Sequence, residues 1–219
     1  MQDALEKLKD GIRRFRRDVY PAEVYTYRRV ESEPQRPHTL FITCADSRVD
    51  PVSLTQASPG DIFVMRNIGN LVPAYGEMLG GVSAVIEFAV LGLKVQHIAV
   101  CGHSDCGAMK ALLHPQSTEK MPTVTSWLSN ARTALGVAQS LHTRGEWRRD
   151  LLTLLTEQNV LLQLQHLRTH PSVASALALG DLSVSGWVYD IAEGEVRITA
   201  DGTNNFAPVE GQPTGAISA

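Results

Sequence analysis

The chain is poor in cysteine, which argues against one large class of folds. Three cysteines in 219 residues are too few, and odd in number, for a disulfide-stabilised scaffold. In a reducing compartment such thiols serve as metal ligands, as catalytic groups or as small core residues. The cysteines are therefore the first positions at which to look for chemistry.

The sequence also lacks a strong charge excess and a long apolar run. The formal net charge is −3 at pH 7, which gives no global sign of nucleic-acid binding. No apolar run is long enough to span a bilayer, and the N-terminal stretch MQDALEKLKD has no apolar signal-peptide core. We therefore predict a cytoplasmic protein with no membrane span and no nucleic-acid partner.

What is present indicates one α/β domain over residues 1–202. A hydrophobic content of 43% is enough for one sizeable core. Helices are expected at 2–19 (an amphipathic N-terminal arm with a basic face), 80–92, 105–113, 124–142, 147–168 and 172–179. Strands are expected at 38–43, 61–66, 95–101, 183–191 and 195–200.

The alternation of these elements predicts the sheet topology. Strands that alternate with helices form βαβ units and a mainly parallel sheet flanked by helices. The last two strands are joined by the turn Glu193-Gly194 and add an antiparallel edge. Residues 203–219 are rich in glycine, proline and small residues, so we expect a loose tail.

Two short motifs place metal-binding side chains where parallel strands end. Cys44 closes one predicted strand in FITCADSRVD, and His103 and Cys106 follow another in AVCGHSDCGAM. The carboxyl ends of neighbouring parallel strands meet at one edge of a sheet, where sites form. Two thiolates and one imidazole suit Zn²⁺, and a catalytic zinc site keeps a fourth position open.

Weaker interpretations of the same residues stay open at this point. His-x-x-Cys alone is a weak metal signal, and a lone Cys44 is more often a small buried residue. Cys101 lies inside a predicted strand, so we interpret it as a core residue. A redox pair is disfavoured because the sequence has no Cys-x-x-Cys.

Taken together, the motifs C-A-D-S-R-V and G-H-S-D-C-G, with Cys44 and His103 59 positions apart, resemble the β-class carbonic anhydrases. The segments GDIFVMRNIGNLV (60–72) and GWVYDIAEGEV (186–196) are also similar, the latter to plant and cyanobacterial-like bacterial members. The resemblance covers roughly residues 30–200. It implies the family's α/β fold, one Zn²⁺ per chain, and reversible hydration of CO₂ to bicarbonate and a proton. It also implies a homodimer or homotetramer in which the N-terminal helix embraces a partner subunit.

The resemblance assigns the metal and catalytic roles residue by residue. Cys44, His103 and Cys106 match the zinc ligands, and Asp46 and Arg48 match the family's Asp–Arg pair. Asp46 would orient the zinc-bound hydroxide that attacks CO₂, and would bind the metal itself in a closed state only. Arg48 would keep Asp46 ionised and aimed, since a guanidinium fork fits a carboxylate.

Substrate contacts are implied as well. Gln35, Phe63 and the Gly107 amide match substrate-pocket positions, and Phe88 stands where many members carry tyrosine.

A second departure from the family pattern concerns regulation by bicarbonate. Members inhibited by bicarbonate at a non-catalytic site carry Trp and Gly where this chain has Phe41 and Thr43, although Tyr189 matches the third member of that set. We therefore expect no such regulation.

Two rival functions fit the same motifs. One is a hydrolase of COS or CS₂ on the same scaffold, which would differ in access to the pocket. The other is a non-catalytic structural or interaction protein with a closed Cys₂His–Asp zinc site.

Overall fold

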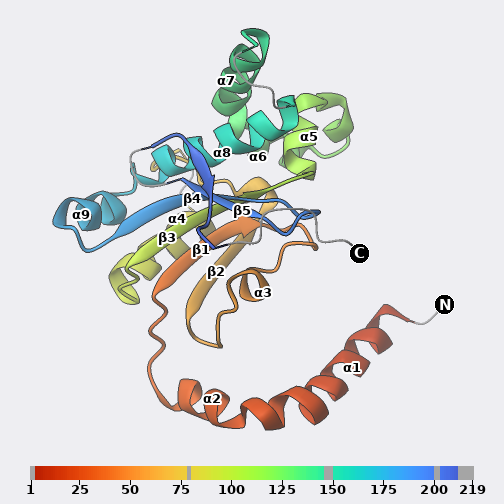
Figure 1. The fold of residues 1–219 in the computed structure, drawn as a ribbon, viewed down its shortest axis with the longest axis vertical. Coiled ribbons are helices and arrows are strands. Elements are labelled where there is room, and N and C mark those ends of the chain that lie inside the picture. The colour runs from red at the N-terminus through yellow and green to blue at the C-terminus, as the bar shows by residue number, and fades with distance from the viewer. Residues whose placement is uncertain (1–2, 78–79, 146–149, 200–202, 212–219) are drawn as a thin grey trace.

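The centre of the fold is a six-stranded sheet (Figure 1). The computed structural model describes residues 3–77, 80–145, 150–199 and 203–211. The strand order is β2-β1-β3-β4-β5-β6. The strands are β1 (Thr39–Cys44), β2 (Ile62–Asn67), β3 (His97–His103), β4 (Ser183–Tyr189), β5 (Val196–Thr199) and β6 (Phe206–Pro208).

The first four strands are parallel, and β5 and β6 add an antiparallel edge. The predicted α/β class with a mainly parallel sheet is thus confirmed. The expected loose tail needs a correction, because residues 206–208 pair with β5 as an edge strand. The end of the tail, 212–219, lies outside the described residues.

Helices cover the sheet and make its central strands fully buried. Every residue of β1 and β3 except the first is buried, as expected for parallel strands covered on both faces. The helix α8 (Leu151–Leu167) packs on β3 and β4. It approaches closely because Gly102 and Gly186 have no Cβ. An added Cβ would lie 2.9 and 2.7 Å, respectively, from methyl carbons of Val160.

The N-terminal arm departs furthest from the sequence expectation. The helix predicted at 2–19 corresponds to α1 (Ala4–Arg14) and a π-helical turn (Phe15–Val19). It does not end there but continues as α2 (Tyr20–Ser32). Pro21 does not end it, because proline in the first turn of a helix removes no intrahelical bond. The arm lies apart from the sheet and its covering helices (Figure 1).

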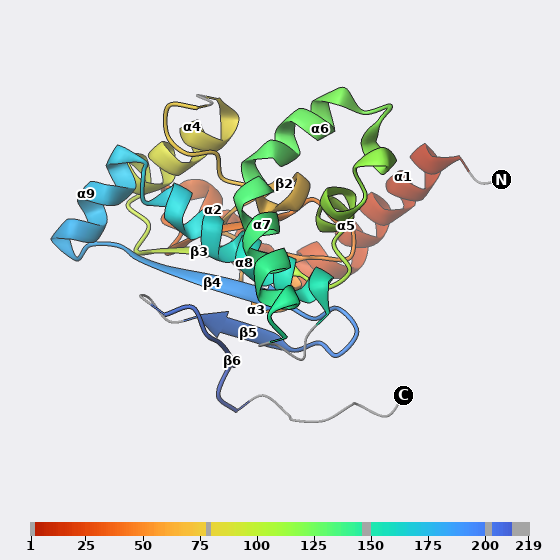
Figure 2. The ribbon, with the colours of Figure 1, turned by 90° about the horizontal axis from the view of Figure 1, so that it is seen from above.

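The remaining helices follow the predicted pattern with shifted boundaries, except that the short helix α3 was not predicted. They are α3 (Pro51–Thr55), α4 (Gly81–Glu87) with a π-turn (Phe88–Gly92), α5 (Gly107–Leu113), α6 (Pro122–Leu128), α7 (Arg132–Thr143) and α9 (Pro171–Leu179). The helix expected at 124–142 is two helices, because a 3₁₀ turn (Ser129–Ala131) separates α6 from α7. In Figure 2, α4, α6 and α9 lie above β4, and the edge strands β5 and β6 lie below it.

No helix in the described ranges is both long and apolar enough to cross a membrane. The cytoplasmic location stays a prediction.

Candidate metal centre

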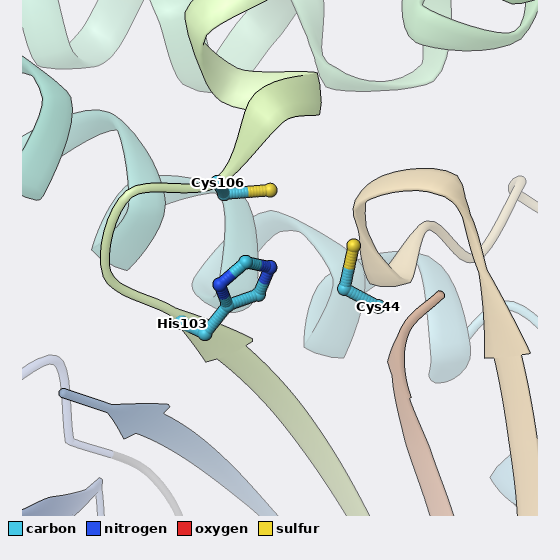
Figure 3. Close-up of side chains that lie close together, drawn as sticks. All are labelled: Cys44, His103 and Cys106. Carbon is cyan, nitrogen blue, oxygen red and sulfur yellow. The ribbon is translucent and has the colours of Figure 1, made fainter. Parts of the chain in front are cut away.

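The structure brings Cys44, His103 and Cys106 together, as the motif spacing predicted. Their potential ligand atoms all lie within 4.8 Å of one another, and all three residues are buried. Cys44 ends β1, and Cys106 is the residue before α5. His103 is the last residue of β3 rather than a residue beyond it. The imidazole and both sulfurs face a common gap (Figure 3).

The His103 ring has one nitrogen suited to a metal. Its Nδ1 lies 2.8 Å from the carbonyl oxygen of Ser104, and only a protonated Nδ1 can donate to that acceptor. In the neutral ring Nε2 then carries a lone pair. That atom is buried and has no hydrogen-bond partner among the described residues. A metal ion would satisfy it, and the partner of Nδ1 would fix the orientation of the ring.

The two thiols are arranged so that a cation is needed for both to ionise. A hydrogen bond from Cys106 lowers the pKa of Cys44 to about 4. The pKa of Cys106 is raised, because its ionisation would put a second negative charge beside Cys44 in a buried site. A bound metal ion removes this conflict, since coordination deprotonates thiols outright. Burial raises the pKa of Cys101 to about 12, so that thiol stays neutral in the core.

Asp46 and Arg48 form a two-pronged ion pair beside this group. Arg48 donates from Nε to Asp46 Oδ1 over 2.9 Å and from Nη2 to Oδ2 over 2.8 Å. The backbone N–H of Arg48 adds a third bond to Oδ1 at 3.0 Å. These bonds, the side-chain ones first, hold the pKa of Asp46 well below its usual range. Asp46 Oδ2 lies 3.8 Å from the bare Nε2 of His103.

Arg66 and Gly69 support the site, and sequence reasoning did not single them out. Arg66 donates from Nε to the carbonyl oxygen of Cys44 over 3.1 Å and from Nη2 to that of Asp46 over 2.5 Å. The backbone N–H of Gly69 donates to Cys44 Sγ. Both residues lie in GDIFVMRNIGNLV, so the family-like segment contained the signal.

Only one of the four expected substrate-pocket residues lies beside the metal centre, at the carboxyl ends of the parallel strands. Gly107 directly follows Cys106 and opens α5. Phe63 pairs in register with Leu40, near the amino end of β1. Its ring packs on that of Phe88, with 6.1 Å between centroids. Gln35 precedes β1 and lines a surface pocket with His38 and Gln96.

The length of β1 separates the other three expected pocket residues from the metal centre of their own chain. The five steps along β1 from Thr39 to Cys44 separate the two ends of the sheet by about 16 Å, at ~3.3 Å per residue. Gln35, Phe63 and Phe88 lie at the end opposite the metal centre.

The comparisons with known proteins agree with this geometry. A family model described as carbonic anhydrase matches residues 39–196. The solved structure of the β-carbonic anhydrase CcaA superposes with a TM-score of 0.87 at 38% identity, covering 95% of this chain and 93% of that one. The chain belongs to the β-carbonic anhydrase family.

Two further relatives extend the comparison of this β-carbonic anhydrase. The carbonic anhydrase of Pseudomonas aeruginosa is 45% identical over 204 residues, which cover 93% of this chain and 91% of the relative. A tetrameric β-carbonic anhydrase of Sordaria macrospora superposes with a TM-score of 0.78 at 27% identity, covering 91% of this chain and 97% of that one. Membership in the family identifies the chain as an enzyme of the carbonic anhydrase type.

Proposed function

We propose that the protein catalyses the reversible hydration of CO₂ to bicarbonate and a proton, with zinc held by Cys44, His103 and Cys106. The observation that carries this proposal is the buried, bare Nε2 of His103 beside two thiols and the Asp46 carboxylate. Two thiolates and one imidazole form a donor set that zinc accepts in catalytic sites. A zinc ion bound there supplies a Lewis acid that lowers the pKa of a bound water molecule.

The role of Asp46 follows from its charge and position. Its lowered pKa keeps the carboxylate ionised throughout the neutral range. An ionised carboxylate only accepts hydrogen bonds, so Asp46 would accept one from the reacting water and direct a lone pair of that water toward CO₂. Because Arg48 occupies both carboxylate oxygens, Asp46 is held where it can accept this bond without binding the metal. The amide of Gly107 would bind an oxygen of bicarbonate.

We further propose that a second copy of the chain completes the substrate pocket. Gln35, Phe63 and Phe88 lie too far from the metal centre of their own chain to contact its substrate, and Phe88 is half exposed. A partner subunit would bring these three residues to the site.

The N-terminal arm fits the same arrangement. Its apolar side chains are largely exposed, with Leu8 at 68% and Ile12 at 66%. A partner subunit would cover this stripe, and the tetrameric relative supports a homo-oligomer.

Stopped-flow CO₂ hydration by zinc-loaded protein near pH 8.5 tests the proposal, and we expect rapid turnover that is lost on zinc removal. Hydrolysis of COS and CS₂ is measured in parallel. Turnover of those substrates without CO₂ hydration would identify the alternative hydrolase. Tight zinc binding with no turnover at all would indicate a structural zinc protein.

A further inference from the structure

Arg48 joins the two loops that carry the candidate metal ligands. Its Nε and Nη2 atoms bind Asp46, in the loop after β1 that follows Cys44. On its other side, Nη1 donates to Asp105 Oδ2 over 2.8 Å, and Nη2 donates to the carbonyl oxygen of Asp105 over 3.2 Å. Asp105 lies in the loop after β3, between His103 and Cys106. The guanidinium thus lies between two carboxylates from different loops.

The backbone at Asp105 is itself unusual. Its φ of +58° lies in the left-handed region, which aspartate and asparagine tolerate better than other side chains do. The carboxylate also forms an ion pair with Lys110 of α5. Lys110 and Arg48, in that order, lower the pKa of Asp105. Charges therefore alternate in sign along Asp46, Arg48, Asp105 and Lys110.

We propose that Asp105 is a positioning residue for CO₂ hydration: it holds Arg48 from the far side so that the guanidinium fork stays against Asp46. This inference rests on the proposed roles of Asp46 and Arg48. Arg48 is about half exposed, and a long side chain held at one end only keeps much of its rotamer freedom. An isolated surface ion pair would add little, but a shared guanidinium with bidentate geometry is the arrangement in which such pairs matter.

Two substitutions at Asp105 separate its side chain from its backbone. Glycine adopts φ near +58° freely and removes the acceptor, whereas asparagine tolerates the same φ and keeps one neutral acceptor for Nη1. We expect Asp105→Gly to lower kcat for CO₂ hydration about tenfold with a smaller change in KM, since a hydrogen bond between charged groups is lost. Asp105→Asn should recover part of that loss. Lys110→Met serves as the matched control and should stay within about twofold of the wild type.

A double-mutant comparison tests whether Asp105 acts through Arg48. If it does, Asp105→Gly should cause no further loss of kcat in an Arg48→Ala background, because coupled residues are non-additive. Equal losses in both backgrounds would overturn the inference. So would a wild-type kcat in Asp105→Gly.

A second readout does not depend on activity. In ¹⁵N-arginine spectra of the zinc-loaded protein, the Nε–H of Arg48 should be protected from exchange with solvent in the wild type and in Lys110→Met. It should lose that protection in Asp105→Gly, and unchanged protection there would overturn the anchoring role. If instead Arg48→Ala keeps normal CO₂ hydration, the proposed function of Arg48 fails, while the spectra still decide whether Asp105 anchors it.

Discussion

The backbone N–H of Gly69 donates a hydrogen bond to Sγ of Cys44, with 3.4 Å between the two atoms. Gly69 has a φ of +78° and sits in a short 3₁₀ turn after β2. Asn159 of α8 fixes this turn by donating to the carbonyl oxygen of Gly69 over 3.1 Å. A buried helix thereby supports a cysteine that lies far from it in the sequence.

Gly69→Ala should weaken zinc binding as well as folding. The left-handed φ costs an alanine about 1–2 kcal/mol, and its Cβ would lie 3.0 Å from the Cβ of Ala108, so the turn must shift. Loss of support to a metal ligand typically costs 10–100-fold in affinity, and we expect zinc affinity to fall within about that range. Competition with a chromophoric chelator measures it.

Gly180→Ala is the matched control for this experiment. Gly180 has nearly the same φ, +77°, and an added Cβ meets no atom of the described structure within 4 Å. It should therefore share the backbone cost and keep wild-type zinc affinity. Equal affinity loss in both variants would show that the Gly69 turn does not support Cys44.

Removal of either candidate cysteine ligand should remove zinc. We expect about one zinc ion per chain in the wild type, and little in Cys44→Ser or Cys106→Ser, because two protein ligands hold zinc poorly. Cys101→Ala should keep the metal, since that thiol is buried and neutral at ordinary pH. Elemental analysis of purified protein measures all four. Equal zinc content in the Cys44 and Cys101 variants would disprove the ligand assignment.

Mixed oligomers test whether a partner completes the pocket. Gln35→Ala should be nearly inactive because it spoils the pocket of the neighbouring subunit, and Cys44→Ser should be inactive because it lacks metal. When the two are co-expressed with different tags and the mixed species is purified, one site combines an intact metal centre with an intact Gln35. CO₂ hydration should reappear there at up to half the wild-type rate. A mixed oligomer no more active than its parents would place Gln35 outside the site.

The sequence predicted that the three candidate metal ligands lie together, because they belong to short local patterns. Cys44 and His103 each end a strand, and parallel strands bring their carboxyl ends to one edge whatever the rest of the chain does. Even Asp46 and Arg48 are two residues apart and pair within one loop. Such contacts need no knowledge of distant packing.

The support of the site, the length of the N-terminal arm and the position of the expected pocket residues depended on tertiary structure that no local pattern contains. The support of Gly69 comes from Asn159, ninety positions later in the chain. The arm extends beyond the helix predicted at 2–19, since Pro21 lies in the first turn of α2 and does not end the helix. Phe63 and Phe88 matched the family's pocket residues, but the resemblance alone did not show that they lie at the far end of the sheet.

Bicarbonate should not inhibit this enzyme cooperatively. Phe41 and Thr43 stand where the Trp and Gly of regulated members would be. Phe41 is buried, with its ring edge-on to Trp187 and 5.4 Å between the centroids. The hydroxyl of Thr43 donates to the carbonyl oxygen of Cys101 over 3.0 Å. These side chains are already packed or bonded. A titration of CO₂ hydration with bicarbonate should give a Hill coefficient near one, and a clearly sigmoidal curve would contradict this.

The last prediction concerns whether the Asp46 carboxylate pairs with Arg48 or binds the metal. Arg48→Ala removes the fork that occupies both oxygens of the Asp46 carboxylate. The freed carboxylate lies 3.8 Å from His103 Nε2, close enough to turn toward a zinc ion on that nitrogen. We expect zinc to be retained with four protein ligands and turnover to fall severely. Asp46→Asn should also lose turnover while keeping an open zinc, because an amide binds zinc poorly and accepts the hydrogen bond of water more weakly.

The pH dependence of the zinc coordination tests the expectation for Arg48→Ala. Arg48 lowers the pKa of Asp46 in the wild type, and without it the carboxyl group returns toward its ordinary value of about 3.9. The carboxylate is therefore fully ionised at pH 7 and pH 9 in both proteins, and its own protonation cannot change the coordination between them. Hydroxide does become more available at pH 9, so in Arg48→Ala it should displace part of the Asp46 carboxylate from the zinc. X-ray absorption at the zinc edge should show an all-protein shell at pH 7 and partial recovery of a water-derived oxygen at pH 9. An oxygen from water at both pH values, with near-normal CO₂ hydration, would mean that Arg48 does not control Asp46.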